Sequence, residues 1–284
     1  MILNSFKNNN LFIKERKAIM AKFIQGVTNY EEWRDHARDS KKYLERMEVI
    51  SEMLPKKDHL SFADEVKLVM CVSVSALTGK LEDFYAVSTS VLMNPICQAR
   101  AKNCDCICKD CYAAAGASRF AGLCQGLETN YLILNNFLIS EEAWALLPIP
   151  TTNGYSRIES HGDVASTVCA INYDRIVASH QHLNFGVWSK NLNIWKTVFD
   201  VEGKPNNMKF IASSPIVNVV MEIPEDMKKY VDHVFTVYDP EYAKANNIAI
   251  NCGTWKGHDL DHRCKLCMRC YMDGTEYFIN ELKK

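Results

Sequence analysis

The sequence predicts an α/β fold, a partial TIM-like (β/α)6 barrel with an N-terminal helical extension and a cysteine-rich C-terminal segment. Short β-rich runs alternate with helical stretches, which is typical of a parallel sheet. The chain has 284 residues, of which 48% are hydrophobic, and this is enough for a large core. Nine of the twelve cysteines fall into two short windows, as expected of metal ligands rather than of scattered core residues.

The amino-terminal part is predicted to be helical after a polar leader at residues 1–20. Apolar residues recur at helical spacing over residues 29–54, and Pro55 follows that segment. A second helix is expected at residues 62–72. We assign residues 1–76 to the leader and a helical cap.

Residues 77–251 are predicted to form the barrel, and residues 252–284 a cluster-binding tail. Six strands are expected within the barrel, at residues 84–92, 156–159, 185–188, 209–212, 233–237 and 248–250. Helices are expected between them at residues 164–180 and 192–199.

Conspicuous polar residues follow the predicted strands, where parallel α/β folds place their ligand-binding loops. The residues that follow the second, third and fourth strands are Glu159, Gly162 and Asp163, then Ser189, Lys190 and Asn191, then Ser213. One cysteine window comes after the first strand, and Cys252 comes after the sixth. Both windows are therefore expected to open onto one rim of the sheet. Arg157, within the second strand, is expected to pair with a carboxylate elsewhere.

The first cysteine group comprises Cys97, Cys104, Cys106, Cys108 and Cys111. Cys104, Cys108 and Cys111 have the spacing CxxxCxxC, which can hold three irons of a 4Fe-4S cluster and leave the fourth iron open. Cys97 can replace Cys104 as the first ligand, and the spacing leaves this choice open.

The second cysteine group comprises Cys252, Cys264, Cys267 and Cys270. Four thiolates can close a second 4Fe-4S cluster or a structural zinc site. His258, Asp261 and His262 lie between the first two of these cysteines, so a mixed Cys/His zinc site is an alternative.

Disulfides are the competing interpretation of so many cysteines, and the sequence argues against them. The first twenty residues contain no apolar run of signal-peptide length, so a cytoplasmic location is expected. No run approaches the roughly 20 apolar residues that cross a bilayer. The net charge of -1 gives no overall attraction for nucleic acid. The isolated Cys71, Cys124 and Cys169 are interpreted as packing residues.

The strand pattern together with CxxxCxxC resembles the radical S-adenosylmethionine superfamily. More closely, an ordered series of segments from about residue 79 to the end resembles phage and prophage proteins called gene-product-88-like. The segments are 108–113 (CKDCYA), 157–163 (RIESHGD), 188–191 (WSKN), 213–215 (SSP) and the terminal cysteines. Asp110 departs from the superfamily pattern, which has an aromatic residue at this position.

The resemblance implies a cluster that reduces bound S-adenosylmethionine, an electron donor of flavodoxin or ferredoxin type, and a substrate that the sequence does not identify. It implies that Glu159 or Asp163 contacts the amino group or ribose of the cofactor, with Gly162 in the same loop. Ser189, Lys190 and Asn191 would orient the cofactor carboxylate or the substrate, and Ser213 belongs to the same set.

A non-enzymatic zinc protein that docks onto a host protein or nucleic acid is the alternative from another class. Basic and aromatic residues beside the cysteines are its basis, because such side chains can stack on bases. They are Tyr112, Arg119, Phe120, Lys265, Arg269 and Tyr271.

Overall fold

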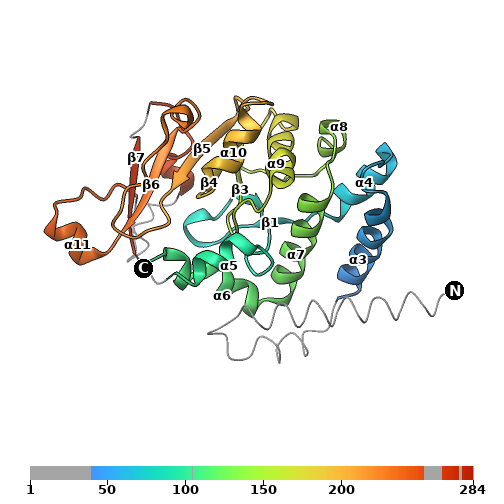
Figure 1. Cartoon of the computed structure of the whole chain (residues 1–284), viewed down its shortest axis with the longest axis horizontal. Helices are drawn as coiled ribbons and strands as arrows, with labels where there is room; N and C mark the ends of the chain where they lie inside the picture. Colours follow the sequence, from blue (N-terminus) through green and yellow to red (C-terminus); the bar gives the residue numbers. More distant parts are fainter. Residues whose placement is uncertain (1–39, 104, 253–263, 275–276, 284) are drawn as a thin grey trace.

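The computed structural model describes residues 40–103, 105–252, 264–274 and 277–283 (Figure 1). The predicted leader and the start of the predicted helix at residues 29–54 lie outside these ranges. Within them, a sheet with helices packed against it forms the centre of the structure. The predicted mixed α/β class is therefore confirmed.

The sheet has seven strands, and their spatial order follows the chain from β1 to β7. The β1 strand runs antiparallel to β2, and every later neighbouring pair is parallel. The strands are β1 Val74–Ala76, β2 Tyr85–Val87, β3 Tyr155–Ile158, β4 Asn184–Ser189, β5 Met208–Ser213, β6 His233–Tyr238 and β7 Phe278–Leu282. Strand order along the chain is what a singly wound parallel sheet with right-handed crossovers produces.

The predicted strand at residues 248–250 is wrong. The preceding helix α11 (Pro240–Ala245) ends with Asn247 in the left-handed region, at φ 52°. The N–H of Ile248 then donates back to the carbonyl of Ala243 at 2.9 Å, as in a helix C-terminal motif. The apolar run therefore covers a helix end, and the strand that completes the sheet is β7, from the predicted tail.

The helices predicted at residues 62–72, 164–180 and 192–199 are confirmed as α4, α9 and α10. Local capping explains where they begin: Ser61 and Asp64 form a capping box on α4, and the Ser166 hydroxyl caps α9. No helix within the described ranges is long and apolar enough to cross a membrane. The helices other than α11 are α3 Lys41–Met53, α4 Phe62–Cys71, α5 Pro95–Ala101, α6 Tyr112–Arg119, α7 Ala121–Asn136, α8 Glu141–Trp144, α9 Thr167–Ser179, α10 Leu192–Phe199 and α12 Cys264–Cys267.

The two faces of the sheet have different surroundings. One row across β2 to β5 packs into the main core with the helices and consists of Val87, Ile158, Val187 and Phe210. The adjacent row points the other way because side chains alternate along a strand, and it consists of Ala86, Arg157, Gly186 and Lys209. We call the side of the sheet that carries this second row the second face.

The first and last of the parallel strands, β2 and β7, approach each other. Lys80 lies in the 3-10 helix η2 (Gly79–Leu81) just before β2, and its ammonium pairs with Glu281 of β7 at 2.5 Å. In a flat sheet, five strand spacings would separate β2 from β7 by about 24 Å. The sheet is therefore strongly curved.

Three cysteines predicted to be packing residues are buried. Cys71, Cys124 and Cys169 are 8%, 1% and 0% exposed, and each packs in a hydrophobic cluster. This prediction is confirmed, and these positions provide controls for variants of the other cysteines.

Asp174 of α9 gives the core a pH-dependent stability. Its Oδ1 has no hydrogen-bond partner among the described residues, and burial, with Glu202 and Glu141, raises its pKa from 3.8 to about 7. Between pH 4 and pH 7 the folded protein holds a proton that the unfolded chain has released, so stability falls as the pH rises. We expect Asp174→Asn to raise the free energy of unfolding at pH 8 by about 1–2 kcal/mol and to leave it unchanged near pH 4. Denaturant unfolding at several pH values checks this, with exposed Asp58→Asn as the control, and an unchanged pH slope in Asp174→Asn would contradict it.

Candidate metal centre

The first cysteine group is carried by one short segment between β2 and α7. Cys97 lies on α5, Cys108 lies in the 3-10 helix η3 (Ile107–Asp110), and Cys111 separates η3 from α6. Cys104 lies outside the described residues, so the structure describes Cys97 but not its competitor for the position of first ligand.

This segment is attached to the carboxyl ends of the strands. The Tyr112 hydroxyl donates to the carbonyl of Ser160, after β3, at 2.6 Å. The N–H of Ile107 donates to the carbonyl of Pro215, after β5, at 2.9 Å. The first cysteine group therefore lies at the edge where parallel sheets carry their ligand sites.

Cys97 is in surroundings that disfavour an isolated thiolate. Burial raises the pKa of its thiol strongly, and the negative charge of Asp163 raises it further. Cys108 and Cys111 contribute in the same direction. A bound cation is what allows buried thiols to deprotonate.

Cys108 has both a like-charged and an opposite-charged neighbour. Burial raises the pKa of its thiol to about 12, while the ammonium of Lys190 opposes the rise. Its side chain is also hydrogen-bonded to Cys106, and Cys111 adds to the shift. Cys106 and Cys108 are therefore in hydrogen-bonding contact, and the positive charge of Lys190 acts on the Cys108 thiol.

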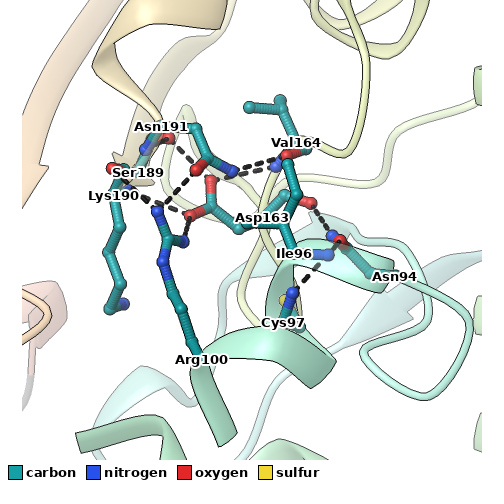
Figure 2. Close-up of polar contacts among 9 residues, drawn as sticks. All are labelled: Asn94, Ile96, Cys97, Arg100, Asp163, Val164, Ser189, Lys190 and Asn191. Carbon is teal, nitrogen blue, oxygen red and sulfur yellow. Dashed lines mark hydrogen bonds and ion pairs between the residues drawn. The ribbon is translucent and has the colours of Figure 1, made fainter. Parts of the chain in front are cut away.

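Asp163 organises the loops around the first group (Figure 2). Its carboxylate accepts four hydrogen bonds, from the N–H of Val164 (2.9 Å), the hydroxyl of Ser189 (2.6 Å), the N–H of Lys190 (3.0 Å) and the guanidinium of Arg100 (3.1 Å). The group is only 3% exposed. Asp163 therefore ties the loop after β3 to the loop after β4 and to α5.

Two residues of this network fix the helix that carries Cys97. Asn94 caps α5 by accepting hydrogen bonds from the N–H groups of Ile96 and Cys97 at 3.0 and 3.3 Å, and it donates to the carbonyl of Asp163 at 2.7 Å (Figure 2). At the other end of α5, Arg100 also donates to the side chain of Asn191 at 2.5 Å. The position of Cys97 thus depends on contacts with both loops.

Glu159 is a second internal acceptor. It accepts hydrogen bonds from the N–H of Thr89 at 3.0 Å, from the Thr89 hydroxyl, and from Tyr173 at 2.8 Å. Burial raises the pKa of Glu159 to about 7, although these hydrogen bonds act to lower it. Gly162 packs against the same group, since a Cβ there would lie 2.5 Å from the Glu159 carboxylate and 2.9 Å from the Thr89 carbonyl.

The residues predicted to bind a cofactor therefore divide into two kinds. The side chains of Glu159, Asp163, Ser189 and Asn191 are engaged within the protein. The Lys190 ammonium and the Ser213 hydroxyl have no hydrogen-bond partner among the described residues, and both follow or end a strand of the sheet.

The thiols of the second cysteine group influence one another electrostatically. Burial raises the pKa of Cys252 to about 11 and that of Cys270 to about 12, and Cys264 and Cys267 add to both shifts. Lys80 opposes the shift of Cys252, with its ammonium 3.9 Å from the sulfur. Cys252, like Cys108 of the first group, therefore has a lysine cation near its thiol.

The prediction that Cys252 follows the sixth parallel strand is wrong. Its N–H donates to the carbonyl of Asn280, within β7, at 2.9 Å. Lys265 of α12 pairs with Asp83, just before β2. The group therefore lies between the two outer parallel strands, instead of at the end of a sixth strand.

Tyr271 anchors this segment on the second face of the sheet. Its ring centroid lies 5.2 Å from Phe84, 5.5 Å from Tyr155 and 5.8 Å from Trp188, and the residue is 5% exposed. Gly186 leaves room for it, since a Cβ there would lie 2.7 Å from the Tyr271 ring. Buried in this way, Tyr271 is not available to stack on bases, although the docking alternative counts it among its six basic and aromatic residues.

Arg157 does not form the expected ion pair with any described carboxylate. Its guanidinium carbon lies 3.8 Å from the centroid of the Trp188 ring, and its Nε has no hydrogen-bond partner within the described ranges. The Arg157 guanidinium thus contacts an aromatic ring on the second face, that of Trp188, instead of a carboxylate.

The described side chains do not form a site for a single ion. No group of three or more cysteine, histidine, aspartate or glutamate side chains in the described part of the chain is arranged around one metal position. Cys104, His258, Asp261 and His262, which entered the predicted sites or the zinc alternative, lie outside that part.

Sequence reasoning missed Asn94 and Arg100, and it placed Cys106 in the first cysteine group without giving it a role as a ligand. The pair Asn94-Pro95 is a helix-start signal, an N-cap followed by proline, and would have predicted α5. No local signal identifies Arg100, because its partners Asp163 and Asn191 are 63 and 91 residues away in the sequence.

Comparison with known proteins gives one match. A family model described as gene product 88 matches residues 65–272, a range that contains both cysteine groups and most of the sheet. No curated protein and no solved structure matches the chain.

Proposed function

This chain belongs to the gene product 88 family, and we propose that it is an iron–sulfur protein of phage or prophage origin that carries out radical S-adenosylmethionine-type chemistry. The observation that carries the proposal is the attachment of the segment with Cys97, Cys108 and Cys111 to the carboxyl ends of the strands. The donor set consists of thiols, which select iron–sulfur clusters or zinc over hard cations.

We propose that these thiols hold a 4Fe-4S cluster and not a single ion. In a cubane each thiolate binds a different iron, so the sulfurs stand farther apart than the ligands of one zinc ion. We propose Cys97, Cys108 and Cys111 as the ligands of the first cluster.

We also propose that the sheet is a partial barrel. Two features support this: six parallel strands in sequential order, and the Lys80–Glu281 pair that joins the outer strands. The second face is then the concave side. The second cysteine group, at the lateral opening, would hold an auxiliary cluster that relays electrons or binds substrate.

The free polar groups at the rim suggest how a cofactor is held. A cluster held by Cys97, Cys108 and Cys111 would supply one electron for the cleavage of a carbon–sulfur bond in bound S-adenosylmethionine, chemistry that would yield methionine and a 5'-deoxyadenosyl radical able to abstract hydrogen from substrate. Lys190 and Ser213 have the side chains available to orient the carboxylate of this cofactor. Glu159 and Asp163 hold the loops in place, since their oxygens already accept hydrogen bonds from the protein.

Iron content tests the first cluster. We expect anaerobically reconstituted protein to be brown and to contain iron and sulfide, and we expect the double variant Cys108→Ala/Cys111→Ala to lose about half of both, because only the second group then retains its ligands. Iron and sulfide assays with a visible spectrum measure this, and Cys124→Ala, at a packing position, is the control.

Two results would contradict the cluster assignment. Unchanged iron in the double variant would exclude Cys108 and Cys111 as ligands. Colourless protein with stoichiometric zinc would support the docking protein instead, for which Tyr112 and Phe120, 70% and 62% exposed beside the first group, are available contact residues.

Cofactor cleavage tests the reaction. We expect reduced, cluster-loaded protein to convert S-adenosylmethionine into 5'-deoxyadenosine, with dithionite or a flavodoxin- or ferredoxin-type protein as the electron donor, and we expect Lys190→Ala to reduce the yield by about tenfold because the cofactor carboxylate loses its cation. Chromatography of the products checks this. Absence of 5'-deoxyadenosine from fully loaded wild-type protein would refute the radical reaction while leaving the clusters in place.

A further inference from the structure

Arg157 occupies a central position on the second face of the sheet. It lies on β3, in register with Ala86 of β2 and Gly186 of β4. Its guanidinium stacks over Trp188 at 3.8 Å, and its buried Nε has no hydrogen-bond partner among the described residues. A planar guanidinium fixed by stacking is preorganised to bind a carboxylate through two hydrogen bonds.

Two lysines of the sheet and its connecting segments have carboxylate partners. Lys80 pairs with Glu281 at 2.5 Å. Lys209, in the same row as Arg157, lies 3.8 Å from Asp232 and also pairs with Asp273. Arg157 therefore contributes one positive charge that no described carboxylate balances.

The Arg157–Trp188 pair also lies beside the second cysteine group. The Trp188 ring centroid is 5.8 Å from that of Tyr271, which directly follows Cys270 in the chain. On the same face, Phe235 and Val237 of β6 are only half-buried. An anion held at Arg157 would therefore lie over the concave side of the sheet, near the second cysteine group.

We propose that Arg157 and Trp188 form the binding site for the carboxylate group of a small organic anion. A single unbalanced guanidinium matches one negative charge, which favours a carboxylate over a doubly charged phosphate. Only the identification of this anion as the substrate of the enzyme rests on the proposed function. Carboxylate binding itself does not require the radical reaction.

Calorimetric titration of the full chain with benzoate tests the site, with phenylphosphate and phenol as comparison probes. We expect benzoate to bind wild-type protein more tightly than either comparison probe. We expect binding to weaken by at least about tenfold in Arg157→Gln and by less in Arg157→Lys, which keeps the charge but loses the planar fork. Lys209→Gln, which changes a paired cation in the same row, is the matched control and should bind benzoate as wild type does.

The titrations are run on both cluster-loaded and metal-free protein whose circular dichroism matches wild type. Benzoate affinity in Arg157→Gln within about twofold of wild type would overturn the proposal, as would absence of benzoate binding to folded wild-type protein. Tighter binding of phenylphosphate would overturn the preference for a carboxylate. Wild-type protein that binds benzoate but takes up no iron on reconstitution would contradict the proposed function and leave the carboxylate site in place.

Discussion

Replacing Asp163 with alanine is expected to lower the free energy of unfolding by about 3–5 kcal/mol. The carboxylate is 3% exposed and accepts four hydrogen bonds, one of them from Arg100. Removing it leaves the guanidinium, which is itself largely buried, without its charged partner. A buried charge that loses its partner is one of the few single changes with an effect of this size.

The same variant is expected to lose the first cluster. The Asp163 carboxylate holds α5, which carries Cys97, through the guanidinium of Arg100. The hydrogen bond from Asn94 goes to the backbone carbonyl of residue 163 and is kept in the variant. Loss of the Arg100 contact releases one end of α5, so we expect Cys97 to be no longer fixed relative to Cys108 and Cys111. Iron and sulfide per chain should therefore fall by about half, while the second group keeps its metal.

Denaturant unfolding and metal assays check the Asp163 variant. Asp200→Ala is the matched control, because Asp200 pairs with Lys196 in an exposed position and its removal should cost less than about 1 kcal/mol. If Asp163→Ala were no less stable than Asp200→Ala, the network in Figure 2 would not hold the site together.

The variant Gly186→Ala is expected to detach the second cysteine group from the sheet. The added Cβ would lie 2.6 Å from the Trp188 ring and 2.7 Å from the Tyr271 ring, and both rings belong to one packed cluster. Overpacking of this kind costs about 1–3 kcal/mol. Tyr271 follows Cys270 directly, so its displacement should move a cluster ligand.

Metal content separates this effect from a general loss of stability. We expect Gly186→Ala to lose the iron of the second cluster and to keep that of the first, the reverse of the result for Asp163→Ala. Gly122→Ala in α7 is the matched control, because a Cβ there meets nothing within 4 Å and alanine favours a helix. Full iron occupancy in Gly186→Ala would mean that Tyr271 does not position the second group.

Much of the fold could be predicted because it depends on local patterns. The helix α10 has the predicted residues, 192–199, and four predicted strands match β3 to β6 within about two residues. The errors have local causes too. The apolar residues 248–250 follow the end of helix α11 instead of forming a strand. The β7 strand lies in the cysteine-rich segment, where a cluster-binding tail and no strand was predicted.

The sequence indicated which polar residues follow the strands, but not what their side chains contact. Asp163, Ser189, Lys190 and Asn191, four of these residues, do lie in contact with one another. Their roles were not predictable, because the donors that engage Asp163 come from three separate segments. Sequence spacing does not show which of two nearby polar groups turns inward.

By itself, the sequence determined the alternation of strands and helices and the existence of two thiol-rich segments, because hydrophobic periodicity and cysteine spacing are properties of short stretches of chain. Only the tertiary structure decided that Asp163 and Glu159 are internal acceptors, that Arg157 stacks on Trp188, and that the second group lies between β2 and β7. These outcomes depend on which residues, up to about two hundred positions apart, come within hydrogen-bonding or van der Waals contact, and that is fixed by the curvature of the sheet.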